Sequence, residues 1–389
     1  MTTILATSDN HLGFRQYGML EREQDIEKAF NNIITLAIEL DVNAITVSGD
    51  LIHSTRPTSR TMDFLSRMHV LLKNNNMPCL VSSGNHDKSE PHWIEVLGDS
   101  EDCLKGGFAL IDNKQVNIGV ISIYGQPFVS RKEWEEKKND IPDVDILLMH
   151  QSFSEFAFAN PDTSFYPKDL KHLNVDTVVM GDIHVTESYN IKSESDLATE
   201  DIVVLSPGSS ELISAVEPTT KGVFLIYKND DPEAGEDIVR NFVPIKTRSV
   251  IKGLVENEDD VTGIIEHIGK DIVTNSNNPR YQEDINDYPL VFVEYDPEVA
   301  YVVDRIRREW PGIMLRAKPR SIVEDQELVE STDSRQEEVS EILSRMLPKN
   351  THASTDTLAH ELLNPECDVN VRLDDYVKCW KEEQNSGYS

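Results

Sequence analysis

The chain has 389 residues, of which 39% are hydrophobic and 27% charged, and its formal net charge is −32. This length predicts two or three domains, and this composition a soluble globular protein. The acidic excess argues against a surface that binds a polyanion throughout, although a metal site, a local basic strip or a partner subunit can still hold phosphate. No apolar run approaches the roughly 20 residues that span a bilayer, and the strand pattern at the amino terminus leaves no room for a signal peptide. We therefore expect a cytoplasmic protein without membrane contact.

The four cysteines are scattered along the chain, at Cys79, Cys103, Cys367 and Cys379. No two of them have the CxxC spacing, so neither a zinc ribbon nor a disulfide framework is indicated. Reduced, partly buried thiols are the expected state.

Residues 1–245 alternate strand-like and helix-like patterns. Apolar runs typical of strands occupy residues 2–9, 43–50, 78–85, 116–125, 144–150, 175–182, 201–209 and 221–228. Helical spacing recurs at 60–76 and at 21–41, where the apolar residues of one face are Ile26, Phe30, Ile33, Ile34, Ala37 and Ile38. Several strands are almost wholly apolar, as expected for strands buried on both faces. The pattern predicts an α/β fold with a two-layer β-sandwich core flanked by helices.

The pattern changes near Val250. Residues 246–325 predict a smaller α+β domain, with strands at 249–255, 288–296 and 312–319 and helices at 260–273 and 297–310. The polar run at 229–237 predicts an exposed loop in the boundary region.

Residues 326–389 predict a linker and short amphipathic helices, at 334–347, 356–363 and 373–383. Helices this short bury little surface alone. They either fold back onto the body of the protein or dock on a partner.

Five apolar runs end in side chains that can bind metals. Their ends read "SDNH", "SGDLIH", "SGNHD", "LLMH" and "MGDIH", which supply Asp9, His11, Asp50, His53, Asn85, His86, Asp87, His150, Asp182 and His184. One histidine at a strand end is usually an ordinary core or surface residue, but apolar strands have no structural need for five such endings. Alternate strand residues point the same way, and the glycines before Asp50, Asn85 and Asp182 let the backbone approach closely. We expect these residues to meet at the carboxyl edge of the sheets.

A mixed set of carboxylate, imidazole and amide ligands suits Mn²⁺, Fe²⁺ or Zn²⁺. Seven candidate ligands are too many for one tetrahedral zinc and fit a pair of ions, which at about 3.5–4 Å apart stabilise the attacking and leaving oxygens of phosphoester hydrolysis. Asp50 is the candidate bridge, because a carboxylate can give one oxygen to each ion. His86 is a candidate general acid for the leaving oxygen, with Asp87 as its orienting partner. His53 can orient the phosphate, or it can be an ordinary loop histidine.

The motif order D-x-H, GD-x-x-H, GNHD, H and G-x-x-H is similar to that of calcineurin-like metallophosphoesterases. Three longer stretches, "DNHLGFRQYGMLEREQDIEKAF", "SGDLIHSTRPTS" and "SPGSSELISAVEPTTKGVFLI", resemble the SbcD-type nuclease subunit of the double-strand-break repair complex. The resemblance covers about the first 245 residues and rests beyond them on domain layout.

This resemblance implies a nuclease with 3′-to-5′ exonuclease action on duplex DNA ends and endonuclease action on single strands. It implies two Mn²⁺ ions, with Mg²⁺ or another divalent metal as alternatives, held by Asp9, His11, Asp50, Asn85, His150, Asp182 and His184. His86 would be catalytic and His53 would assist it. Residues 246–325 would cap the DNA groove, and residues 326–389 would bind an SMC-like ATPase partner. The protein would act as a homodimer, with the helix within 22–40 as a candidate for the interface.

Asp182 departs from the family pattern, which has G-H-x-H where this chain has "GDIH". Carboxylate oxygen favours Mn²⁺ or Mg²⁺. The additional negative charge should hold the ion more tightly and make it a weaker Lewis acid.

Four cations just beyond the ligand motifs are candidate DNA contacts: Arg15, Arg56, Arg60 and Lys88. Each of them alone can also be a solvated loop charge.

Two other functions remain open. An enzyme of the same fold that acts on a small phosphoester or nucleotide would explain the ligands, but not "HLGFRQYG", the second domain or the helical tail. A non-catalytic scaffold would explain Asp182, but not the intact Asp50, Asn85 and His86.

Overall fold

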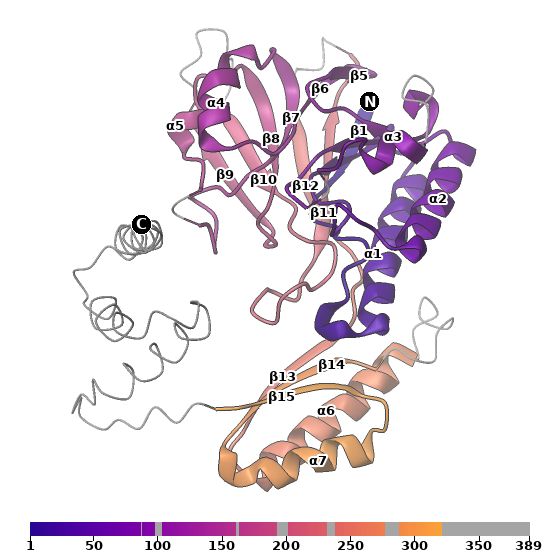
Figure 1. Cartoon of the computed structure of the whole chain (residues 1–389), viewed down its shortest axis with the longest axis vertical. Helices are drawn as coiled ribbons and strands as arrows, with labels where there is room; N and C mark the ends of the chain where they lie inside the picture. Colours follow the sequence, from indigo (N-terminus) through magenta and orange to yellow (C-terminus); the bar gives the residue numbers. More distant parts are fainter. Residues whose placement is uncertain are drawn as a thin grey trace, which may run out of the picture. The chain divides into compact units, whose positions relative to one another are not determined.

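A computed structural model describes residues 1–86, 88–97, 103–160, 163–192, 201–231, 238–276 and 288–320 (Figure 1). All of these belong to one compact unit, Met1–Arg320. The helices expected within 326–389 lie outside the described residues, as do Asp87 and most of the loop expected at 229–237. Within the described part of the chain, no helix has the length and apolar character needed to cross a membrane.

The first sheet has six strands in the order β12-β11-β1-β2-β3-β4. Their bounds are β1 (Thr2–Thr7), β2 (Ala44–Ser48), β3 (Pro78–Ser82), β4 (Gly107–Leu110), β11 (Gly222–Lys228) and β12 (Val239–Pro244). β1 to β4 pair in parallel, so their carboxyl ends lie on one edge, whereas β11 and β12 add in antiparallel fashion. Two long helices, α1 (Leu20–Glu39) and α2 (Ser59–Asn74), pack on this sheet (Figure 1).

The second sheet also has six strands, in the order β5-β6-β7-β8-β10-β9. Their bounds are β5 (Gln115–Ile118), β6 (Ile121–Gln126), β7 (Val144–His150), β8 (Val175–Gly181), β9 (Glu187–Ile191) and β10 (Ile202–Ser206). The four central strands are parallel, and β5 and β9 are antiparallel edges. The short helices α4 (Arg131–Lys137) and α5 (Pro167–Leu170) pack against it, and α4 opens with a capping box between Ser130 and Glu133.

The two sheets face each other across an apolar layer, which confirms the predicted β-sandwich flanked by helices. Strand β1 shows why: Ile4 and Ala6 belong to the core shared with the second sheet, while Leu5 between them belongs to the core under α1 and α2. Both faces of the strand are therefore apolar, as its sequence predicted. Cys79 on β3 is buried in this region with a free thiol.

A third sheet follows, in the order β13-β14-β15 and parallel throughout. It consists of β13 (Val250–Val255), β14 (Leu290–Tyr295) and β15 (Met314–Pro319), with α6 (Glu258–Ser276) and α7 (Ala300–Glu309) covering one face (Figure 1). This sheet and its helices have a core of their own, which includes Val291, Ile268 and Ile306. The elements match those expected, and the domain limits at 245 and 325 stay a prediction.

The remaining described helices are one turn of α-helix, α3 (Trp93–Leu97), and 3₁₀ turns at Gln16–Gly18, Cys103–Lys105, Lys138–Asp140 and Pro297–Val299. Buried Arg22 on α1 pairs with Asp25. Arg248, which follows β12, donates to both carboxylate oxygens of the same Asp25 at 2.6 Å, so the segment after β12 is joined to α1.

The run 116–125, predicted as one strand, is a hairpin of β5 and β6. Gly119 has φ +54 and closes the turn, a backbone conformation that other residues adopt only with strain. The strand prediction counted apolar residues and gave this glycine no weight. Strands β4, β9 and β12 were not predicted either; all three are edge strands, and β9 exposes the polar residues Ser188 and Asn190.

Substituting Gly119 by alanine should lower the stability of the protein by more than about 1 kcal/mol. A Cβ atom there would lie 2.2 Å from Thr2 Oγ1, in addition to the positive φ. The matched control is Gly263→Ala on α6, where a Cβ meets nothing within 4 Å and helix propensity should add about 0.5–1 kcal/mol. Denaturant or thermal unfolding of both variants measures this. Equal midpoints for the two would contradict the assigned hairpin.

Candidate metal centre at the shared edge of two sheets

The carboxyl ends of β1, β2 and β3 in one sheet and of β7 and β8 in the other meet at one edge. The loops after β1 and β2 are held together there by backbone hydrogen bonds from His11 N to Asp50 O at 2.8 Å and from Asp9 N to Gly49 O at 3.2 Å. All five predicted strand ends therefore deliver their polar side chains to the same place.

Four of the predicted ligands are buried: Asp9, His11, Asp50 and His150. His150 Nε2 is 3.4 Å and His11 Nε2 is 3.7 Å from the same oxygen, Asp50 Oδ2. His150 Nδ1 lies 3.0 Å from the carbonyl oxygen of Ser48. Since only a protonated Nδ1 can make that hydrogen bond, Nε2 of His150 is the nitrogen that faces Asp50 and that can bind a metal once its proton is lost.

The other three predicted ligands are less buried and lie on top of this layer. Asn85 Oδ1 is 3.0 Å from His150 Nε2, and His184 Nε2 is 3.1 Å from His11 Nε2. Asp182 places Oδ1 4.0 Å from His150 Nε2. The structure thus brings all seven predicted ligands together, and their role as ligands stays a prediction.

The glycines before the ligands are needed for this approach, as the sequence predicted. A Cβ at Gly49 would lie 2.1 Å from His150 Nδ1, and one at Gly84 would lie 2.0 Å from Asp50 Oδ1. A Cβ at Gly181 would lie 2.1 Å from the carbonyl oxygen of Ser48. Any side chain at Gly49 or Gly181 would push the two sheets apart, and one at Gly84 would displace Asp50.

Burial and mutual charge shift the pKa values of these groups in opposite directions. Burial raises the pKa of Asp9 to about 6 and lowers that of His11 well below its ordinary value. Burial also opposes charge on His150, yet Asp50, Asp9 and Asp182 raise the pKa of His150 to about 10. For Asp50 the attraction of His150 and His11 outweighs burial and holds its pKa well below the usual range. Protonated His150 therefore occupies the position of a cation, and a metal would displace its proton.

The donor atoms fit a divalent metal. Asp9 Oδ2 is buried and has no hydrogen-bond partner among the described residues, an arrangement that is costly for a carboxylate unless a cation neutralises it. Ligand atoms lie within 4.8 Å of one another in three groups, which are Asp9–His11–His184, Asp9–Asp50–His150 and His11–His53–His86. Carboxylate, imidazole and amide donors together suit Mn²⁺ and its neighbours.

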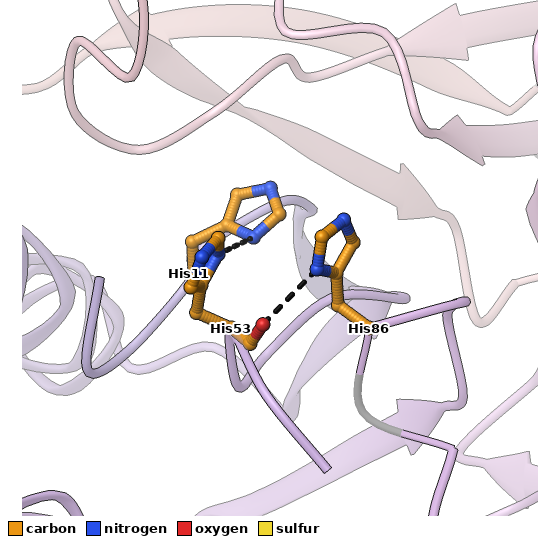
Figure 2. A group of neighbouring side chains, drawn as sticks. All are labelled: His11, His53 and His86. Atoms are coloured by element: carbon orange, nitrogen blue, oxygen red, sulfur yellow. Dashed lines mark hydrogen bonds between the residues drawn. The ribbon is translucent and has the colours of Figure 1, made fainter. Parts of the chain in front are cut away.

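His53 and His86 lie beside the buried layer (Figure 2). Their rings stack at 5.0 Å with 20° between the planes, and His53 Nδ1 is 3.3 Å from His11 Nδ1. His86 is exposed. Its backbone N–H donates to Asp50 Oδ1 at 3.0 Å, and its Nδ1 lies 3.0 Å from the carbonyl oxygen of His53. His86 is thus reachable from solvent next to the candidate ligands.

The predicted DNA contacts differ in their surroundings. Arg15 pairs with Glu23, and Arg60 pairs with Glu27 at 2.6 Å and lies 3.5 Å from Glu23. Arg56 and Lys88 are exposed, and the described part of the chain holds no salt bridge to either. Contact with DNA stays a prediction for all four.

Glu217 belongs to the site and was missed. Its carboxylate oxygens lie 3.0 Å from His184 Nδ1 and 2.6 Å from Lys221 Nζ, and it also accepts from the backbone N–H of Ser214 at 2.8 Å. Lys221 is buried and donates to the carbonyl oxygen of His184 at 2.9 Å. A glutamate and a lysine in a loop are ordinarily solvated, so the one signal that could have found them was their place in the stretch "SPGSSELISAVEPTTKGVFLI".

Comparisons with known proteins agree with these features. The family model of the calcineurin-like phosphoesterases matches residues 2–186. The DNA double-strand break repair protein Mre11 of Methanosarcina acetivorans is 28% identical over 268 residues, which are 66% of this chain and 41% of that protein. That of Methanosarcina mazei is 30% identical over 257 residues, 59% of this chain and 40% of that protein. That of Saccharolobus solfataricus is 27% identical over 345 residues, 80% of this chain and 86% of that protein.

The chain spans only about two-fifths of the length of the two Methanosarcina proteins. The matched family model covers the strands and loops that carry all seven predicted ligands, from β1 to the loop after β8. This chain contains a calcineurin-like phosphoesterase domain and is similar in sequence, over much of its length, to archaeal Mre11 proteins.

Proposed function

We propose that this protein is a metal-dependent DNA nuclease that hydrolyses phosphodiester bonds in the repair of double-strand breaks. The observation that carries the proposal is the convergence of seven ligand-type side chains from two sheets beside an exposed histidine, His86. The similarity to DNA double-strand break repair proteins supports DNA as the substrate.

Two divalent ions, Mn²⁺ in the first instance, would be held by Asp9, His11, Asp50, Asn85, His150, Asp182 and His184. Asp50 would serve both ions, since its Oδ2 lies between His11 and His150 at 3.7 and 3.4 Å. When bound, such a pair supplies hydroxide at neutral pH and neutralises charge on the phosphate.

His86 would protonate the departing oxygen. Its Nδ1–H is engaged by the carbonyl oxygen of His53, so Nε2 is the atom that can carry the transferable proton toward substrate. His11 can donate from Nδ1 to His53 Nδ1, which leaves His11 Nε2 free as a ligand and puts the proton of His53 on Nε2. His53 would then be a hydrogen-bond donor to the phosphate.

Glu217 would fix the orientation of His184. A carboxylate that accepts from the Nδ1–H of a ligating histidine holds its ring and directs Nε2 at the metal. Lys221 in turn offsets the buried charge of Glu217, because the two form an ion pair at 2.6 Å with almost no solvent exposure.

In detail, the protein would act as a 3′-to-5′ exonuclease on duplex ends and as an endonuclease on single strands. We propose a homodimer, with Arg56 and Lys88, more than Arg15 and Arg60, reaching DNA phosphates. Residues 246–325 would cap the DNA, and the segment 326–389 would dock on an SMC-like ATPase in the cytoplasm. Support for these assignments comes from the sequence resemblance.

Digestion of end-labelled duplex DNA in Mn²⁺ tests the activity, and the variant His86→Asn tests the mechanism. Loss of a general acid should slow DNA cleavage by about 10²–10⁴-fold while Mn²⁺ binding, measured by calorimetry, stays the same. Hydrolysis of a p-nitrophenyl phosphodiester should fall much less, because p-nitrophenolate leaves without a proton.

His172→Asn, at an exposed histidine after α5, is the matched control and should change neither rate. Equal loss on both substrates would contradict the acid role of His86. Cleavage of the small ester without cleavage of DNA would favour a small-phosphoester enzyme, and no hydrolysis of either would favour a scaffold.

Asp182→His should weaken Mn²⁺ binding by on the order of tenfold and shift the preference toward Zn²⁺, since one hard anionic oxygen is replaced by a neutral imidazole. The neutral ligand should leave the ion a stronger Lewis acid, so the rate at saturating Mn²⁺ should rise. Metal titration with each ion and cleavage at saturation measure the two effects. Unchanged Mn²⁺ affinity and unchanged metal preference in this variant would show that Asp182 is not a ligand.

Glu217→Gln should weaken Mn²⁺ binding by about 10–100-fold, the usual effect of removing the partner of a ligating histidine. It should also destabilise the metal-free protein, because Lys221 loses its counter-charge in a buried site. The double variant Glu217→Gln/Lys221→Met separates the two roles. Stability should recover in it and metal affinity should not. Recovery of both would mean that Glu217 serves Lys221 alone.

A further inference from the structure

A cavity of about 920 Å³ lies between the third sheet and the loop that leads to Glu217. Helices α6 and α7 cover one face of the sheet, and the other face lines the cavity with Lys252, Phe292, Glu294, Arg316 and Lys318. The nuclease domain contributes Tyr17, Ala215 and Val216. Leu212 packs with Leu290 and Met314 of the third sheet, so the two walls are joined through a buried apolar contact.

The cavity wall combines aromatic and cationic side chains in one row. Lys252, Phe292 and Arg316 are direct cross-strand neighbours on β13, β14 and β15. The guanidinium carbon of Arg316 lies 4.0 Å from the ring centre of Tyr17, and the Tyr17 and Phe292 rings approach edge to face at 6.1 Å. Two rings and a planar cation therefore face the same space from opposite walls.

This row is cationic in a chain whose net charge is −32. Among the described salt bridges, Arg307 pairs with Asp304 and Arg320 with Glu256, whereas none involves Lys252, Arg316 or Lys318. Glu294 is the acidic residue among those that line the cavity. A local excess of unneutralised cations on so acidic a protein indicates an anionic ligand.

The aromatic component narrows the class of anion. A cavity of this volume admits a ligand of small-molecule size and not a duplex, whose bases are in any case stacked on one another inside the helix. An unpaired nucleotide offers both a base face for Tyr17, Phe292 or Arg316 and a phosphate for Lys252 or Lys318.

One residue, Glu217, contacts both the cavity wall and the candidate metal centre. Lys252 Nζ donates to the backbone carbonyl of Glu217 at 3.2 Å, and the carboxylate of the same residue holds His184 at 3.0 Å. Val216, next to Glu217, lines the cavity and is 70% exposed. A DNA strand that contacts Val216 in the cavity is therefore one residue away from Glu217, whose side chain positions the candidate ligand His184.

We propose that this cavity binds one or two unpaired nucleotides at a DNA end, so that the protein reads single-strand character beside its metal centre. The proposal rests on the proposed nuclease function and specifies the form of DNA on which that nuclease would act. The nucleotide stacks on Phe292 or Tyr17, and its phosphates are held by Lys252, Arg316 and Lys318.

Fluorescence titration of the full chain in EDTA, where no cleavage occurs, tests this. The probes are a labelled twelve-residue dT strand, a blunt duplex and the same duplex with a 3′ overhang. Phe292→Leu and Arg316→Gln should each weaken binding of the dT strand and of the overhang by at least about fivefold, the loss expected for one stacking contact, and leave the blunt duplex unchanged. Leucine keeps the apolar packing of the partly buried Phe292. Arg305→Gln on α7, a matched charge on the helical side of the same sheet, should have no effect.

Single-strand binding that is insensitive to Phe292→Leu and Arg316→Gln overturns the proposal, as does an equal loss on the blunt duplex, which would indicate a general DNA contact. A twelve-residue poly-glutamate peptide that binds as tightly, with the same sensitivity, overturns it in favour of an acidic peptide. Both variants should hydrolyse a p-nitrophenyl phosphodiester in Mn²⁺ at the wild-type rate. Cavity-dependent dT binding in a protein that cleaves no DNA would keep the site and reject the nuclease function, so the two failures are distinguishable.

Discussion

The hydrogen bond from His150 Nδ1 to the carbonyl oxygen of Ser48, 3.0 Å long, joins the two sheets at the edge where the candidate ligands meet. It runs between Gly49 and Gly181, neither of which has room for a Cβ atom. The same bond sets the tautomer of His150, so that Nε2 faces Asp50 and Asn85. A packing constraint between two apolar sheets therefore also determines the chemistry of the site. If the sheets separated slightly, the ligands contributed by the second sheet would no longer reach those of the first.

Most of the residues that meet at this site could be predicted because the ends of buried strands can be located in a sequence. A buried strand is an apolar run, its carboxyl end is a position in the sequence, and parallel strands place such ends on one edge, as β7 ending at His150 illustrates. Glu217 was not predictable in this way. Its role depends on how the loop between β10 and β11 folds over this edge, where it contacts Lys221 and His184. The same limit hid the pairing of Arg15 and Arg60 with carboxylates of α1, since a sequence does not show which loop charges meet. Gly119 itself is visible in the sequence, but the sequence does not show that this glycine adopts a positive φ and divides the apolar run into two strands.

Asp182 has a second contact that gives its loop a defined place. Its backbone N–H donates to Asp9 Oδ1 at 3.0 Å, so the position is held by its main chain whichever side chain it carries. Burial raises the pKa of the Asp182 carboxyl, and the negative charge of Asp50 raises it further. A third carboxylate in this site is therefore unfavourable in the absence of a cation. The departure from histidine makes the site more dependent on metal, which argues for retention of a metal-binding function at this position.

Acidity of the whole chain shapes how it can meet DNA. A surface with net charge −32 repels a polyanion at long range, so counterion release from a broad basic face is not available as the main source of affinity. Arg15 and Arg60 are already neutralised by Glu23 and Glu27. A bound metal pair and the row around Arg316 would then be two local sources of attraction, in addition to the exposed Arg56 and Lys88. Glu217 contacts the candidate ligand His184 through its carboxylate and Lys252 of that row through its carbonyl. Under the proposed function, local attraction of this kind favours an unpaired strand end, which can enter a cavity that is too small for a duplex.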